Sequence, residues 1–359
     1  MKKGILIGAL AGGLALGAGT AQAGDVLLVA SGEDLAAAIE AANSDSSIET
    51  IRCSSEAACD YVGTLPAYTG THRLVVDGHY STIDATGVSN EDIFTSVGGA
   101  PLKLMRLTFI GGKSGLYVEI PAEKTGSQRV ELKRMVMRDA AWHAVYINDV
   151  DYSVASVRLT IDTSRFLDNG FAEKNKEGIR VRETSKGMIM ANITNSTFRG
   201  NSGDGLSLNE KGGGRVFVTM DNTDFIENGS NPLSLYDLED GFDVDEFGPG
   251  DVWLTVTNSR FNKNFDDGVD IDERQGGSIY ATFDGVFATK NLDQGMTFDE
   301  RLKGDFVVDV SHSTISGNDG AKSIDLYGSQ SDIGDGSLTL NDVTINNWSL
   351  SGVLLTVTP

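Results

Sequence analysis

Short segments that alternate apolar and polar residues recur along the second half of the chain, each directly after a glycine. The alternation has a period of two, which predicts strands with one buried face. The glycines are separated by 27, 36, 27 and 27 residues. They are Gly178, Gly205, Gly241, Gly268 and Gly295, and the segments after them are Ile179–Val181, Leu206–Leu208, Phe242–Val244, Val269–Ile271 and Met296–Phe298.

Asparagines keep the same spacing as the glycines. They recur with steps of 27, 36, 27 and 27 residues, and most follow an apolar residue by three positions. Each repeat also holds two further short apolar stretches, so we expect three strands per repeat. Stacking every strand on its equivalent in the next repeat pairs all backbone groups. The spacing therefore predicts an all-β, single-stranded parallel β-helix, a solenoid of about 27 residues per coil. Its bends would be lined by Asn201, Asn228, Asn264, Asn291 and Asn318.

The repeat also has a recognisable motif. Residues 258–268 read Asn-Ser-x-Phe-x-x-Asn-x-x-Asp-Gly. This pattern resembles the repeat of the right-handed parallel β-helix in the pectate-lyase-like superfamily, over roughly residues 70–359. The resemblance implies a right-handed solenoid. It does not specify an activity, because the superfamily includes lyases, hydrolases, epimerases, phage spikes and adhesins.

The N-terminal region reads as an export signal followed by a cap. Two lysines, a short apolar run and Ala21-Gln22-Ala23 predict a signal peptide over residues 1–23. A membrane anchor is the alternative, but the apolar run is short and glycine-rich, and no later run is long enough for a span. We therefore expect a secreted, periplasmic or cell-surface protein without a membrane span.

Residues 24–70 are expected to form the N-terminal cap and the first coil, and residues 71–359 the β-helix. Ser31 and Asp34 resemble a capping box, and an apolar helical face follows them, which predicts a short capping helix. Cys53 and Cys59 either form a small disulfide or remain two free thiols. No matching helix follows at the C-terminus, so the protein is either a monomer or an end-to-end dimer.

The chain is strongly acidic, with 51 Asp and Glu against 29 Lys and Arg and a net charge of −22. A surface that binds nucleic acid needs clustered Lys and Arg, so the composition argues against nucleic acid as a partner.

The strand after each glycine is expected to expose columns of side chains, turn by turn. The first column reads Tyr117, Tyr146, Arg180, Ser207, Asp243, Asp270, Thr297 and Asp325. The second reads Glu119, Asn148, Arg182, Asn209, Asp245, Asp272, Asp299 and Tyr327. A third, just past the strand, reads Glu183, Glu210, Glu246, Glu273 and Glu300, and Lys211, Arg274 and Arg301 follow the glutamates of their turns.

Carboxylates on adjacent turns would lie roughly 4.8 Å apart and repel by roughly 3.5 kcal/mol at an effective dielectric constant near 20. Raised pKa values, a bound Ca²⁺ ion or pairing with the neighbouring Lys and Arg would each relieve this repulsion. A plain solvated acidic face is the simplest alternative. The metal hypothesis names as ligands Asp243, Asp245, Asp270, Asp272 and Asp299.

The 36-residue step contains about nine additional residues near 231–239, which form either a tolerated surface loop or a wall over this face. In the second case Tyr236 would stack on a sugar ring, and Arg180, Arg182 and Asn209 would bind substrate.

Three classes of function fit these patterns. The first is a Ca²⁺-dependent lyase of an acidic polysaccharide, similar to the calcium-dependent β-helix lyases, with Lys211, Arg274 or Arg301 as proton acceptor. The second is a non-catalytic carbohydrate- or calcium-binding surface protein. The third is a glycoside hydrolase with paired aspartates, although the Gly-His-Gly motif of the polygalacturonase-like families is missing.

Overall fold

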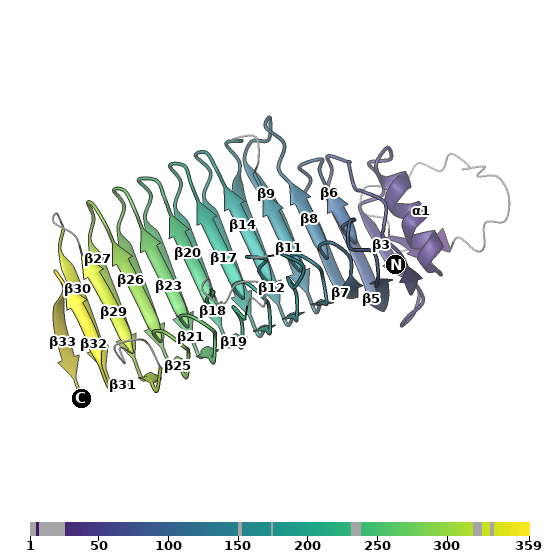
Figure 1. The fold of residues 1–359 in the computed structure, drawn as a ribbon. Helices are drawn as coiled ribbons and strands as arrows, with labels where there is room; N and C mark the ends of the chain where they lie inside the picture. The colour runs from purple at the N-terminus through teal and green to yellow at the C-terminus, as the bar shows by residue number, and fades with distance from the viewer. Residues whose placement is uncertain are drawn as a thin grey trace.

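The computed structural model describes residues 5–6, 26–149, 153–173, 175–230, 238–318, 325–330 and 334–359. The chain winds into a right-handed parallel β-helix, an elongated solenoid whose turns follow one another along a single axis (Figure 1). The predicted export signal lies outside the described residues apart from β1, Ile5–Leu6, which pairs with β2, Val26–Val29.

One sheet has ten strands and takes one strand from each turn from β6 onward. Its strands are β6 Phe94–Ser96, β8 Leu116–Glu119, β11 Val145–Asn148, β14 Ile179–Glu183, β17 Leu206–Glu210, β20 Phe242–Glu246, β23 Val269–Glu273, β26 Met296–Glu300, β29 Leu326–Gln330 and β32 Trp348–Ser351.

The other strands form a 23-stranded sheet to which most turns contribute a longer and a shorter strand. Besides β1 and β2, the longer strands are β3 Thr50–Cys53, β5 Leu74–Ala85, β7 Leu102–Gly111, β9 Ser127–Lys133, β12 Ser156–Asp162, β15 Ile189–Thr194, β18 Val216–Asp221, β21 Val252–Thr257, β24 Ile279–Asp284, β27 Phe306–Ser311, β30 Gly336–Asn341 and β33 Leu354–Thr358. The shorter strands are β4 Tyr61–Val62, β10 Val136–Arg138, β13 Arg165–Leu167, β16 Thr197–Arg199, β19 Asp224–Ile226, β22 Arg260–Asn262, β25 Phe287–Thr289, β28 Thr314–Ser316 and β31 Thr344–Ile345.

The core is a set of ladders that run along the solenoid axis. Phe166, Phe198, Phe225 and Phe261 are fully buried, and their rings stack at centroid distances of 5.0, 4.5 and 5.1 Å. The repeated motif brings the same residue type to the same place in these turns, although the coils differ in length. Each fully buried phenylalanine stabilises the fold by roughly 1.5–3 kcal/mol.

The predicted asparagine ladder is confirmed. The side-chain amide of Asn228 donates to Oδ1 of Asn264 at 3.1 Å, and Asn264 donates in the same way to Asn291 at 3.0 Å. The ladder ends where Asn318 donates to Asp325 at 2.9 Å. Asp325 therefore faces the interior, and its predicted place in the first outward column was wrong.

The period of glycines has a steric cause. A Cβ atom added to Gly268 would lie 2.5 Å from the carbonyl oxygen of Gly295 on the next turn. At Gly268 the two turns can therefore approach this closely because the residue has no side chain.

Helix α1, Gly32–Ala42, lies at the N-terminal end of the solenoid (Figure 1). Ser31 is its N-cap and accepts a hydrogen bond from the backbone N–H of Asp34 at 3.1 Å, as the capping box predicts. Leu35 and Ile39 are fully buried. Beside the first coil, Cys53 and Cys59 are joined in a disulfide. Among the described residues, no helix combines the length and the apolar character that crossing a membrane requires.

The glutamate column differs from its predicted position. Glu183, Glu210, Glu246, Glu273 and Glu300 are fully buried instead of facing outward. They have the same strand parity as the inward apolar residues. Their carboxylates accept hydrogen bonds from backbone N–H groups of the loop that directly follows each strand, as Glu273 does from Gly277 at 3.0 Å. The alternation along each strand thus directs these side chains into the interior. The buried carboxylates are tolerated there because the fold supplies hydrogen-bond donors for them.

Candidate acidic site

The outward face of the ten-stranded sheet brings the predicted acidic residues into register. Asp243 on β20 lies opposite Asp270 on β23. In the second column Asp245 lies opposite Asp272, and Asp272 lies opposite Asp299 on β26. The stacking of acidic residues on three consecutive turns is therefore confirmed.

The turn that contains β29 is shifted by two residues from its predicted register. Tyr327 lies opposite Thr297, and Ser329 lies opposite Asp299. Asp325, directly before β29, occupies the position that glycine holds before β26. Tyr327 thus belongs to the first column and not to the second, because the glycine that marks this position in the five preceding turns is replaced.

The second column is paired with arginines. Nη2 of Arg274 lies 2.6 Å from Oδ1 of Asp245 and 2.7 Å from Oδ2 of Asp272. Arg301 pairs with Asp272 and Asp299, at 2.8 Å in both cases. Although partial burial opposes the effect, these two carboxylates raise the pKa of Arg301. The three predicted ligands in this column thus have guanidinium partners that partly compensate their charge, and Arg301 is a poor proton acceptor.

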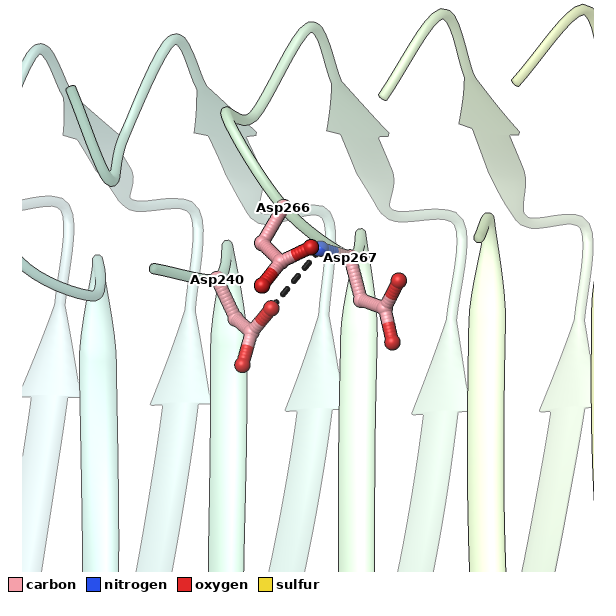
Figure 2. Close-up of side chains that lie close together, drawn as sticks. All are labelled: Asp240, Asp266 and Asp267. Atoms are coloured by element: carbon pink, nitrogen blue, oxygen red, sulfur yellow. Dashed lines mark hydrogen bonds between the residues drawn. The ribbon is translucent and has the colours of Figure 1, made fainter. Parts of the chain in front are cut away.

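The first column forms a different cluster. One carboxylate oxygen of each of Asp240, Asp243 and Asp270 lies within 4.8 Å of the others. Asp240, Asp266 and Asp267 form a second group of the same kind, shown in Figure 2. These five residues are called the aspartate cluster below. Among the described residues, no Lys, Arg or His forms an ion pair with any of them.

Burial and mutual repulsion dominate the electrostatics of the aspartate cluster. Burial, together with the neighbouring carboxylates, raises the pKa values of Asp240, Asp243 and Asp270 well above the ordinary aspartate value. The pKa of Asp266 rises to about 6 and that of Asp267 to about 7, mainly through burial. Without a cation, this cluster holds protons near neutral pH.

Backbone hydrogen bonds fix the cluster in place. The N–H of Asp240 donates to Oδ1 of Asp204 on the preceding turn at 2.7 Å. The N–H of Asp267 donates to Oδ1 of Asp240 at 2.7 Å (Figure 2). Asp204 and Asp240, which both precede a glycine, thus each accept a hydrogen bond from the backbone of the next turn through one carboxylate oxygen.

The donor set fits a hard divalent cation. Oδ1 of Asp270 is buried and has no hydrogen-bond partner among the described residues, although it lies beside the carboxylates of Asp240 and Asp243. A buried acceptor without a donor is costly, and a cation would satisfy it. Ca²⁺ prefers several oxygen ligands in flexible geometry, which three to five carboxylates can supply.

Two of the predicted substrate-binding residues, Arg180 and Asn209, belong to a hydrogen-bond network that reaches the aspartate cluster. Arg180 donates to Oε1 of Glu177 at 3.0 Å and to Oδ1 of Asn209 at 3.3 Å. Asn209 donates to Ser207 at 2.9 Å, and Ser207 donates to Oδ2 of Asp243 at 2.8 Å. Arg180 and Asn209 therefore orient one member of the aspartate cluster.

Arg182 and Lys211 form a cationic pair on adjacent turns. Neither makes an ion pair with a carboxylate within the described part of the chain. Partial burial, followed by the charges of Arg182 and Arg180, lowers the pKa of Lys211. The Lys211 Nζ and the Arg274 guanidinium lie over the ring of Phe247, at 5.0 and 4.5 Å from its centroid. Of the three predicted proton acceptors, Lys211 alone is without a bound carboxylate in this part of the chain.

Sequence reasoning missed Asp240, Asp266 and Asp267. The available signal was the Asp-Gly pair at 240–241 and 267–268, which recurs with the glycine period. Tyr236, the predicted sugar platform, lies outside the described residues.

The chain matches no protein-family profile and no curated protein. Two solved structures are similar in fold. ORF18 of Geobacillus virus E2 is 14% identical with a TM-score of 0.46, and the match covers 84% of this chain and 53% of the viral one, so the chain spans about half the length of that protein. The pectate lyase Pel9A is 15% identical with a TM-score of 0.42, with 92% of this chain and 79% of the lyase covered. Neither likeness bears on the chemistry of the site.

Proposed function

We propose that this protein is an exported, carbohydrate-active β-helix protein that cleaves an acidic polysaccharide by Ca²⁺-dependent β-elimination. The observation that carries the proposal is the aspartate cluster itself, which has no cationic partner in the described chain and lies at the start of β20 and β23, one turn from the strand that Lys211 directly follows. A cation site and a proton acceptor with a lowered pKa are the two groups that such a reaction needs.

The cation would be held by Asp240, Asp243 and Asp270, with Asp266 and Asp267 beside them. When bound, Ca²⁺ would draw electron density from a uronate carboxylate and make the adjacent C–H bond more acidic. It also explains how a polyanion can bind a protein of net charge −22.

The chain's own residues would supply binding and proton transfer. Arg182, which has no ion pair among the described residues, would offer its guanidinium to a second uronate carboxylate. Neutral Lys211 would take the proton from the carbon next to the carboxylate at Nζ. The electrons of the C–H bond then form the carbon–carbon double bond, the bond from the ring to the glycosidic oxygen breaks, and the leaving oxygen takes a proton from solvent.

Ca²⁺ binding is tested by isothermal titration calorimetry. We expect Asp270→Asn to weaken Ca²⁺ binding by tenfold or more. Asp299→Asn is the matched control, because Asp299 is paired with Arg301 outside the cluster, and it should bind Ca²⁺ like the wild type. Equal affinities for both variants would refute the site.

Catalysis is tested with a panel of polyuronates, with and without Ca²⁺, by following the ultraviolet absorbance of unsaturated ends. Lys211→Met should abolish the signal, whereas Lys290→Met, an exposed lysine after β25, should keep it. A Ca²⁺-dependent rise in melting temperature without any products would favour the non-catalytic binder. New reducing ends without absorbance would favour a hydrolase, for which Asp267, with its pKa near 7, would be the general acid.

A further inference from the structure

A groove of about 400 Å³ lies on the 23-stranded sheet, away from the ten-stranded sheet that carries the aspartate cluster. It crosses β18, β21, β24 and β27. Its volume falls in the range of small-ligand sites, and it is too small for a protein interface of ordinary size. The residues that define its character are Phe217, Trp253, Tyr280, Thr219, Thr255 and Thr282.

One row of the groove is aromatic. Phe217 lies opposite Trp253, and Trp253 lies opposite Tyr280 in the parallel register. The rings of Trp253 and Tyr280 stack at a centroid distance of 4.2 Å with an interplanar angle of 24°. Trp253 nevertheless remains 42% exposed. The stack holds a large apolar surface in a defined position at the solvent boundary, and Trp and Tyr are enriched at binding interfaces of this kind.

A parallel row consists of hydroxyl groups. Thr219, Thr255 and Thr282 lie opposite one another, two positions further along the same strands, and all three are exposed. Each hydroxyl can both donate and accept a hydrogen bond. The rows are separated by roughly 6.6 Å and repeat every 4.8 Å or so along the axis, a spacing close to the length of one sugar unit in an extended glycan.

Charge decides the class of ligand. Asp309 is the one acidic side chain of the groove lining, and the lining contains no Lys or Arg. A polyuronate would meet repulsion here without a compensating cation. We propose that this groove binds an uncharged glycan chain, with its apolar C–H faces against the aromatic row and its hydroxyls on the threonine row. This second site does not depend on the lyase proposal.

The test is calorimetric titration of the full chain with uncharged hexasaccharides of β-1,4-linked glucose, mannose and xylose, and with an oligogalacturonate. At least one uncharged hexasaccharide should bind, and the oligogalacturonate should not compete for the same site. Trp253→Ala should weaken binding by tenfold or more, and Thr255→Val, which keeps the shape of the side chain, by severalfold. Circular dichroism and melting temperature show that each variant is folded.

Trp348→Ala is the matched control, because Trp348 is 45% exposed and lies on the other sheet. It should bind like the wild type, and so should Asp270→Asn, which separates this proposal from the acidic site. The proposal is overturned if no uncharged hexasaccharide binds at millimolar concentration. It is equally overturned if Trp253→Ala and the wild type bind alike.

Discussion

The buried glutamate column should make the free energy of unfolding depend on pH. Burial, reinforced by hydrogen-bonding contact with Glu210 and Glu273, raises the pKa of Glu246 from 4.5 to about 11. The pKa of Glu183 rises to about 9, again mainly through burial and contact with Glu210. At the end of the column Gln330 takes the place of a glutamate, and its amide donates to Oε2 of Glu300 at 2.6 Å. A neutral donor is therefore accepted in this column, and we expect Glu246→Gln to be tolerated.

The sign of the effect follows from proton linkage. Above pH 4.5 the unfolded chain releases the Glu246 proton, whereas the folded chain keeps it up to about pH 11. The stability due to this proton is complete below pH 4.5 and is lost as the pH rises toward the folded-state pKa. Each retained proton lowers the free energy of unfolding by ~1.4 kcal/mol per pH unit. Between pH 6 and pH 8 the wild type should lose ~2.7 kcal/mol through this group, and Glu246→Gln should lose none of it.

The assay is urea unfolding at several pH values from 5 to 9, compared between the wild type and Glu246→Gln. The midpoints should diverge as the pH rises, with the variant more stable at pH 8. The reciprocal change Gln330→Glu adds a carboxyl to the column and should steepen the pH dependence. Infrared spectra should show a carboxylic-acid carbonyl band at pH 7 that weakens in Glu246→Gln. If the urea midpoints of the wild type and Glu246→Gln change in parallel with pH, Glu246 does not retain a proton in the folded protein.

Three further predictions concern the ladders and the site. Asn264→Ala leaves the backbone N–H and the side-chain amide of Asn228 without their acceptor, so the free energy of unfolding should fall by ~2–5 kcal/mol. Urea unfolding measures this change, and an unchanged midpoint would contradict a stabilising role of the asparagine ladder. Gly268→Ala should lower the melting temperature because of its 2.5 Å clash, whereas Gly276→Ala, with open space around the new Cβ, should not; equal effects would remove the steric explanation. Arg182→Gln removes a positive charge that lowers the pKa of Lys211, so this pKa should rise and the rising limb of the pH profile of kcat/KM should move to higher pH. A limb that stays in place would exclude Lys211 as the base.

Several parts of the acidic site could be predicted from the sequence and several could not. The vertical register of Asp243 with Asp270 followed from the repeat spacing alone. The pairing of Asp245, Asp272 and Asp299 with arginines did not, because an arginine side chain can reach its own turn or the next, and only packing decides between them. The cluster around Asp240 also depends on how the bend before each strand turns its carboxylate toward the neighbouring turn.

The sequence by itself determined the solenoid, because a recurring motif brings like residues together in successive turns and the asparagine ladder can be read from its spacing. The alternation along each strand also contained the inward direction of the glutamates. Only the tertiary structure decided the arginine pairs and the groove at Trp253. These features depend on which side chains meet across turns, as Arg274 does with Asp245, Arg301 with Asp272 and Trp253 with Tyr280. A spacing places two residues on neighbouring turns, but it does not fix the side-chain conformations that bring them into contact.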